Sequence, residues 1–239
     1  VLANAVGRVH RILRPIGETG GSMTGFNSIP NLVRAHWPVW KGVIPALLLA
    51  FLSTALLLAI AILIKNATGE AFSYMTREPA YIAGLPPFAG LLSNVGILIW
   101  TAAAVVCFLA ATVIDDQRAF LLSSGSLTLM LLLDDMFMFH DVLFPDYLGV
   151  SQNFVYAVYI VVTLAYLATY RRRLLDSEYP VFGAALACFA LSVLTDVLGT
   201  TGFGYRALVE DGFKLLGIVL WTIYFWRHSA VSLRSQSAD

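Results

Sequence analysis

Long apolar runs dominate the chain, and they determine the fold class that it predicts. A membrane-spanning helix needs about 20 predominantly apolar residues. Six runs meet or approach this length: Val43–Ile64, Gly90–Ile114, Ala119–Phe139, Phe154–Tyr170, Val181–Leu198 and Ala207–Trp226. None alternates between apolar and polar residues, as membrane β-strands do. The pattern therefore predicts an all-α fold, a polytopic bundle of six transmembrane helices.

The residues before the first run show a different pattern. Leu2, Val6, Val9 and Leu13 recur at helical spacing among arginines, which is typical of an amphipathic helix lying on an anionic membrane surface. A loosely ordered tail is the alternative for this segment. The expected organisation is a cytoplasmic N-terminal segment with an interfacial helix over 1–41, a six-span domain over 42–228 and a cytoplasmic tail over 229–239.

Composition supports the same class of protein. Hydrophobic residues make up 59% of the 239 residues and charged residues 13%, whereas soluble domains have about 45–50% and about 25%. These values exclude an ordinary soluble enzyme, a disordered chain and a nucleic-acid-binding protein, and they make the lipid bilayer the expected surroundings. The 15 basic residues balance the 15 acidic ones, so the net charge points to no polyanionic or polycationic partner.

The distribution of Lys and Arg predicts the orientation of the spans. Eleven of the 15 lie in segments that share one side of the membrane, and three lie in segments on the other side. Cytoplasmic loops of membrane proteins carry the excess of Lys and Arg. We therefore expect a multi-pass protein of the cell (inner) membrane with both termini in the cytoplasm. The run Arg171–Arg173 is the strongest single indication.

Charged residues interrupt the apolar runs mainly toward their outer ends. These residues are Asp134, Asp135, His140, Asp141, Asp196, Glu210, Asp211 and Lys214. A charge at the centre of a spanning helix costs about 2.5–3.5 kcal/mol, so such residues are rare and usually functional. The expected topology brings all of them, with Ser93 and Asn94 of the second span, to one depth in the outer leaflet. This convergence predicts a polar pocket that opens to the outer face.

Roles follow from the chemistry of these side chains. The expected metal ligands are Asp134, His140, Asp141 and Asp196. The expected catalytic groups are Asp134, Asp135, Asp196 and Glu210. The expected polar lining of the pocket is Ser93 and Asn94. Carboxylates combined with an imidazole suit a divalent metal such as Zn, Fe or Mn, and the cofactor is otherwise unknown.

An ion pair is expected at the start of the last span. Glu210 and Lys214 are four residues apart in the order that favours pairing on a helix, and Asp211 lies beside them. A lysine one turn inside the membrane needs an acidic partner, because a lone buried charge is costly.

Short fragments resemble the seven-span intramembrane metal hydrolases, a superfamily that includes the alkaline ceramidases. The fragments are Ser93-Asn94, Phe139-His140, the segment Leu132–Met138 and Asp196. The resemblance implies a metal-dependent hydrolase that acts on a lipid-like substrate. The last span departs from the family, because Glu210 and Lys214 stand where the family has paired histidines. The family's zinc site is therefore not expected here, and a metal would need carboxylates together with His140.

Three functions remain open from the sequence. The first is an intramembrane enzyme whose metal activates water against a lipid-like substrate. The second is a small proton- or cation-coupled transporter or channel that uses the acids as its binding and relay site. The third is a non-catalytic subunit of a larger membrane complex, or a homo-oligomer, packed through small residues in the second and fifth spans.

Overall fold

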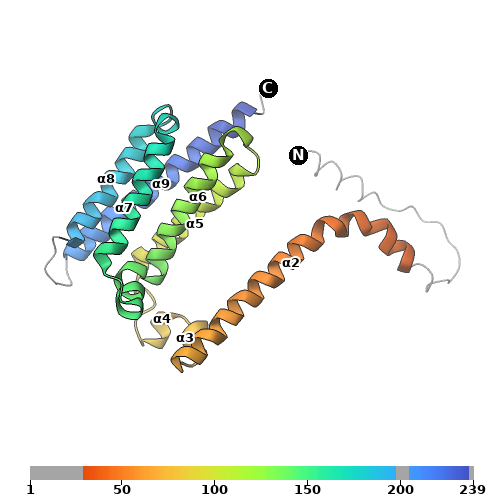
Figure 1. Ribbon diagram of the computed structural model, residues 1–239, viewed down its shortest axis with the longest axis horizontal. Coiled ribbons are helices and arrows are strands. Elements are labelled where there is room, and N and C mark those ends of the chain that lie inside the picture. Colours follow the sequence, from red (N-terminus) through yellow and green to blue (C-terminus); the bar gives the residue numbers. More distant parts are fainter. Residues whose placement is uncertain (1–28, 198–204, 237–239) are drawn as a thin grey trace. The chain divides into compact units, whose positions relative to one another are not determined.

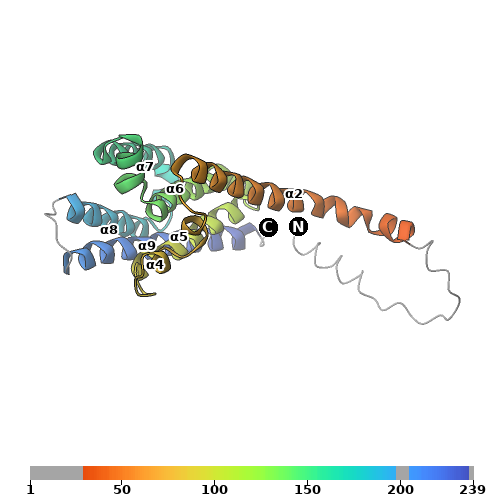
Figure 2. The ribbon, with the colours of Figure 1, turned by 90° about the horizontal axis from the view of Figure 1, so that it is seen from below.

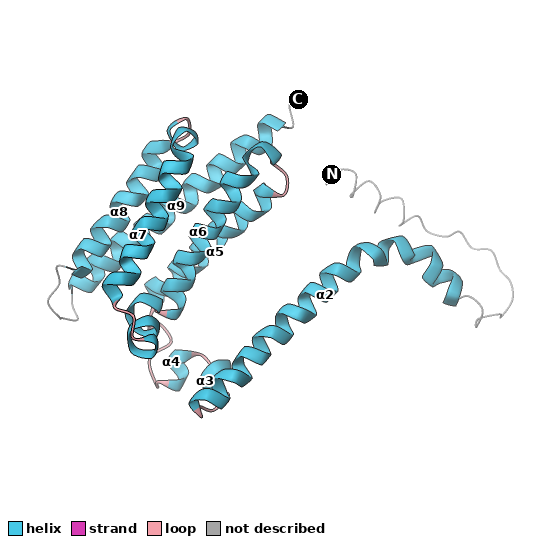
Figure 3. Ribbon diagram, viewed as in Figure 1, coloured by secondary structure: helices cyan, strands magenta, loops and turns pink. Residues whose placement is uncertain are grey.

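The computed structural model describes residues 29–197 and 205–236, and the side chains of residues 43–196 and 207–235. Throughout these ranges the regular elements are helical and there is no strand (Figure 3). The prediction of an all-α protein is therefore confirmed. The expected interfacial helix lies outside the described residues.

Four of the helices match predicted spans to within a few residues, and the first and last long helices extend beyond theirs. In chain order the helices are α2 (Ile29–Thr68), α3 (Ser73–Thr76), α4 (Pro79–Ile82), α5 (Leu91–Ala111), the 3₁₀-helix η1 (Asp115–Gln117), α6 (Arg118–Phe137), the π-helix η2 (Phe139–Tyr147), α7 (Gln152–Leu175), α8 (Tyr179–Val197) and α9 (Tyr205–Gln236). The expected domain boundaries at 42 and 228 both fall inside helices, since α2 begins earlier and α9 continues further.

Five helical segments of the described chain are long and apolar enough to cross a membrane. They are Val43–Thr68, Leu91–Ala111, Asp115–Phe137, Gln152–Leu175 and Tyr179–Asp196. The chain is therefore a helical protein of the multi-pass membrane type. Helix α9 is not among the five, so the sixth expected span is not confirmed.

The chain divides into two compact units, residues 1–85 and 86–239. In the first unit, the Val43–Thr68 part of α2 is almost entirely exposed and apolar. Lys65 Nζ lies 4.5 Å from the centre of the Phe72 ring, which connects the end of α2 to the segment that follows it.

The second unit is a helical bundle that carries the charged residues. Helix α9 packs against both α5 and α8, and α5 also packs against α6 (Figures 1 and 2). Its core is aromatic and aliphatic, with Phe120, Ile218, Trp221 and Phe225 almost fully buried. Gly217 permits the close approach of α8 and α9, because a Cβ atom there would lie 2.7 Å from the ring of Phe189.

Helix α7 is attached to the bundle differently. Only Val155, Tyr166 and Leu174 are buried on it, and tyrosine hydroxyl groups make its cross-links to α6. The hydroxyl oxygen of Tyr166 lies 2.7 Å from that of Ser124, and the hydroxyl oxygen of Tyr170 lies 2.9 Å from that of Ser123. Hydrogen bonds therefore account for much of the attachment of α7, whereas apolar packing holds the other helices of the bundle together.

An unusual backbone turn ends α6. Met138 has a positive φ of 50° and donates its backbone N–H to the carbonyl oxygen of Asp134. A left-handed residue with this bond is a common way to end a helix, although glycine usually occupies the position. The π-helix η2 follows directly, and π-helical segments are frequent at functional sites. The turn brings the residues after Met138 back toward the last turn of α6.

Candidate functional site

Asp134 is the centre of a hydrogen-bonded cluster at the end of α6. One carboxylate oxygen accepts the His140 backbone N–H at 3.0 Å and the hydroxyl of Tyr159 at 2.7 Å. The other lies 2.6 Å from Nδ1 of the His140 ring. The turn at Met138 makes this geometry possible, because it directs both the backbone and the ring of His140 toward Asp134. Both oxygens of the buried Asp134 side chain thus have hydrogen-bond partners, as burial of a polar group requires.

The ring of His140 lies between two carboxylates. Its Nδ1 faces Asp134, and its Nε2 lies 3.2 Å from Oδ2 of Asp141. Asp141 also accepts a hydrogen bond of 2.8 Å from the amide of Gln152, at the start of α7. The exposed fraction of the side chains falls along this line, from 52% for Asp141 through 15% for His140 to 10% for Asp134. The cluster therefore runs from the surface to the interior of the bundle.

These surroundings favour the protonated form of His140. Partial burial by itself lowers the pKa of the imidazole, and Lys214 acts in the same direction. The hydrogen bond to Asp134 and the negative charges of Asp134 and Asp141 raise it, and together they prevail. The pKa of His140 is therefore raised above its ordinary value of 6.5. In the protonated ring both nitrogens are donors, which matches the two carboxylates beside them.

Asp196 joins the cluster from α8 through a tyrosine. The hydroxyl of Tyr156 donates to Oδ2 of Asp196 at 2.9 Å, and the Tyr156 ring lies with its centre 4.8 Å from that of His140. Glu210 lies within electrostatic range of Asp141 and Asp196. Helices α6, α7, α8 and α9 thus all bring charged or hydroxyl groups to this end of the bundle.

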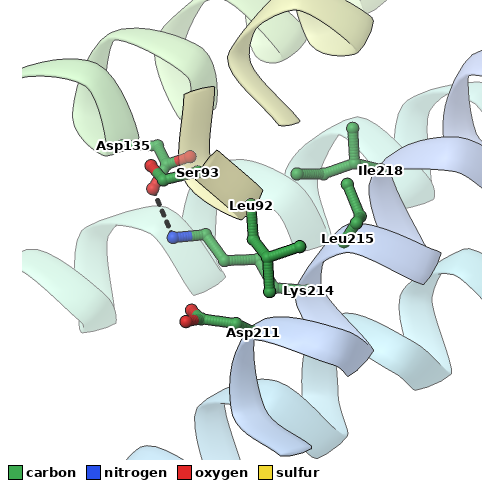
Figure 4. Close-up of a pocket in the computed structure, with 7 residues that line it drawn as sticks. All are labelled: Leu92, Ser93, Asp135, Asp211, Lys214, Leu215 and Ile218. Atoms are coloured by element: carbon green, nitrogen blue, oxygen red, sulfur yellow. Dashed lines mark hydrogen bonds and ion pairs between the residues drawn. The ribbon is translucent and has the colours of Figure 1, made fainter. Parts of the chain in front are cut away.

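A second polar group lies beside the first. Lys214 of α9 forms an ion pair with Oδ1 of Asp135 on α6, as Figure 4 shows. The other carboxylate oxygen, Oδ2, is buried and has no hydrogen-bond partner among the described residues. A small cavity of about 10 Å³ lies at this point. Its lining residues are Leu92, Ser93, Asp135, Asp211, Lys214, Leu215 and Ile218.

We call these residues together the acidic end of the bundle. Its members are Asp134, Asp135, His140, Asp141, Asp196, Glu210, Asp211 and Lys214. The structure brings Asp134, His140 and Asp141 into direct contact, and it reaches Asp196 through Tyr156. Ser93 and Asn94 are both exposed, and of the two only Ser93 lines the cavity with Asp135.

Two expectations about partners require correction. Lys214 pairs with Asp135 rather than with Glu210, because the rotation of α9 directs the lysine toward α6, and Asp211 lines the same cavity. The expected metal centre is not supported. The described side chains contain no group of three or more His, Cys, Asp or Glu residues placed to hold a metal ion. Both ring nitrogens of His140 already face carboxylates.

Sequence reasoning missed the tyrosines of α7. Tyr156 and Tyr159 bind Asp196 and Asp134, and Tyr166 and Tyr170 bind serines of α6. Their spacings of three, seven and four residues place all four on one face of a helix. That stripe was visible in the sequence. A tyrosine in a span gives a weaker indication of a functional site than a charged residue does, so the tyrosines were not among the predicted site residues.

Comparison with known proteins gives a family but no activity. A family model described as "Domain of unknown function (DUF8692)" matches residues 37–228, which is most of the chain. No curated protein and no solved structure matches the chain.

Proposed function

We propose that this chain, which belongs to the DUF8692 family, is a small proton-coupled membrane transporter or channel that binds its proton at Asp134, His140 and Asp141. The observation that carries the proposal is the line of three titratable groups with falling exposure. Ionisable residues placed in this way within membrane helices commonly form proton relays.

The chemistry of the relay follows from the two ring nitrogens of His140. A proton arriving on the exposed Asp141 passes to Nε2 of a neutral ring, and the ring becomes an imidazolium flanked by two carboxylates. The Nδ1 proton then passes to Asp134 over a hydrogen bond of 2.6 Å. The ring is left neutral with its proton on Nε2, and it returns to its first state when Nε2 gives a proton to water and Nδ1 takes one from water. The net result is the transfer of one proton from the surface to the interior.

The proposal includes α9 as a sixth span, with both termini in the cytoplasm and the acidic end at the outer face of the cell (inner) membrane. The excess of Lys and Arg in the segments on one side supports this orientation. A cysteine introduced at Ser177, between α7 and α8, should be labelled by a membrane-impermeant reagent only from the cytoplasmic side. Labelling of intact cells from outside would contradict the orientation.

Proton movement into liposomes tests the function. The purified full chain is reconstituted with a pH-sensitive dye inside, and a potassium gradient with valinomycin provides the driving force. The wild-type protein should acidify the lumen, and Asp134→Asn should reduce the rate by about tenfold or more, since general acid–base groups contribute about 10²–10⁴-fold where proton transfer limits a rate. Asp146→Asn is the control, because Asp146 is an exposed acid of the same η2 segment. Unchanged flux in Asp134→Asn and His140→Gln would reject the proposal.

The other two functions make different demands. A metal-dependent lipid hydrolase, as the resemblance to intramembrane hydrolases implied, requires a bound metal. Elemental analysis that finds stoichiometric zinc, iron or manganese, lost in His140→Gln, would favour it over proton transport. A subunit role requires a fixed membrane partner. Copurification of one such partner, together with no proton flux by the isolated chain, would favour that reading.

A further inference from the structure

The cavity at Asp135 has features of an ion site that the proton relay does not use. Asp135 is 8% exposed, and its Oδ1 is satisfied by Lys214 while its Oδ2 is buried without a partner. An unpaired carboxylate oxygen is costly to bury. The cavity beside it, about 10 Å³, has room for about one particle of the size of water. Besides Asp135 and Lys214, the polar residues that line the cavity are Ser93 and Asp211, so the groups there that can accept a cation are oxygens.

The charge of this region favours a cation. Among the described side chains, the acidic end holds six carboxylates and two groups that can be cationic, His140 and Lys214. Glu210 lies within electrostatic range of both Asp211 and Lys214. Carboxylate and hydroxyl oxygens in such an excess of negative charge attract hard cations. A neutral water would satisfy Oδ2 but would leave the excess charge unchanged.

We propose that this cavity is a binding site for one small monovalent cation, with sodium as the fitting ion, held by Asp135, Ser93 and Asp211. The ammonium group of Lys214 takes the place of the cation on Asp135 when no cation is bound. When sodium binds, Lys214 turns to Asp211, which lies three residues earlier on the same helix and is within reach at that spacing. The site uses two carboxylates and a hydroxyl, so it differs from a transition-metal centre of several His, Cys, Asp or Glu residues.

This inference rests on the proposed transport function only for the biological role of the site, in which sodium is the cation coupled to the proton. The two sites share the α6 segment Asp134-Asp135, so occupancy of one affects the electrostatic environment of the other. Binding of sodium can be measured without any transport. Failure of the ion site and failure of the transport proposal are therefore distinguishable.

The experiment is thermal unfolding of the purified full chain in detergent, with sodium chloride compared with choline chloride at equal ionic strength. Above the dissociation constant, each tenfold increase in sodium should raise the unfolding midpoint by about 3–6 °C, because a ligand that binds only the folded state stabilises it by mass action. Potassium should give a smaller shift, since the cavity has little room. Equal midpoints in sodium and choline would overturn the proposal.

Variants assign the shift to the cavity. Asp135→Asn should abolish the sodium-dependent shift, and Asp146→Asn, which changes an exposed acid outside the cavity, should keep it. Lys214→Met should be less stable than the wild type in choline and should gain more from sodium, because the competing ammonium is gone. A shift of wild-type size in Asp135→Asn, or a smaller gain in Lys214→Met than in the wild type, would contradict the proposal. An intact sodium shift without proton flux would reject transport and retain the ion site.

Discussion

The two ends of the bundle differ in the partners that they give to their buried polar groups. At the acidic end, charged groups meet charged groups, and His140 lies between two carboxylates. At the other end, which we call the aromatic end, His228 lies against the rings of Phe120 and Tyr224 and contacts the neutral amide of Gln117 at 2.7 Å. The aromatic end also includes Tyr166, Tyr170 and Phe225. Phe120 and Asp134 lie on the same helix, separated by about 20 Å of α6.

The two histidines show what this difference means. The pKa of His140 is raised by its carboxylates, whereas the pKa of His228 is lowered, mainly by burial and further by the charge of Arg173. Neutral groups at the aromatic end bond to one another, as Ser177 does with Tyr224 at 2.7 Å, and the buried Oγ of Ser229 there has no partner among the described residues. The aromatic end is therefore organised for stability. The acidic end instead places ionisable groups against one another, as expected of a functional site.

Removal of the Trp221 side chain should have the largest effect on stability. Trp221 is 1% exposed, its ring lies 5.0 Å from that of Phe182, and its Nε1–H donates to Thr128. Trp221→Ala should lower the free energy of unfolding by about 3–5 kcal/mol, the range for large aromatic side chains in cores. Trp226→Ala is the control, because Trp226 is 62% exposed. Similar losses of unfolding free energy in the two variants, measured by chemical unfolding, would show that this part of α9 does not belong to the core.

Breaking the charged pair of the acidic end should come next. Lys214→Met leaves the buried Asp135 without its cation, and loss of one partner of a buried pair costs about 3–5 kcal/mol. We expect the lower end of this range because Lys214 is 31% exposed. The double variant Asp135→Asn/Lys214→Met should lose less than Lys214→Met alone. If the losses of the two single variants simply add, the residues do not interact.

Tyrosine-to-phenylalanine variants on α7 compare the strength of hydrogen bonds at the acidic end and at the aromatic end of the bundle. Tyr159→Phe removes a hydrogen bond to the carboxylate of Asp134, and Tyr166→Phe removes one to the neutral hydroxyl of Ser124. Bonds to charged groups contribute about 1.5–3 kcal/mol and neutral bonds about 0.5–1.5 kcal/mol. Unfolding measurements on both variants should therefore show the larger loss for Tyr159→Phe. The reverse order would mean that Asp134 is not a charged acceptor in the folded protein.

The smallest expected effect is a pH dependence of opposite sign at the two ends. A raised pKa means that the stabilisation from His140 is complete below the ordinary value of about 6.5 and is lost as pH rises through the raised value. A lowered pKa means that stability from neutral His228 is kept above about 6.5 and is lost as pH falls toward the lowered value. Thermal unfolding at pH 5.5 and 7.5 should show a larger penalty for His140→Gln at pH 5.5. The penalty for His228→Gln should be larger at pH 7.5. Parallel profiles for the two variants would contradict the assignment.

Patterns along the chain predict the helices well and the contacts between them poorly. The apolar runs predicted α5 to α8 to within a few residues, because span length and composition are local properties. The partner of Lys214 was mispredicted, because the i,i+4 rule finds neighbours on one helix, whereas Asp135 comes from another helix. The rotation of α9 about its axis selects that partner, and no local pattern encodes this rotation. The turn at Met138 escaped prediction for a related reason, since methionine carries no preference for a left-handed conformation.

The attachment of α7 through tyrosine hydroxyls has a consequence for the membrane around the protein. A helix packed through apolar side chains in a core separates only when those side chains lose their close contacts, whereas a hydroxyl can exchange its partner for water or a lipid headgroup at a small net cost. Displacement of α7 is thus largely an exchange of hydrogen bonds. Hydration of the bilayer and the polarity of its headgroups act directly on that exchange. Two of the four hydroxyls contact Asp134 and Asp196. The lipid surroundings and the charge state of these acids therefore both affect where α7 lies against the bundle.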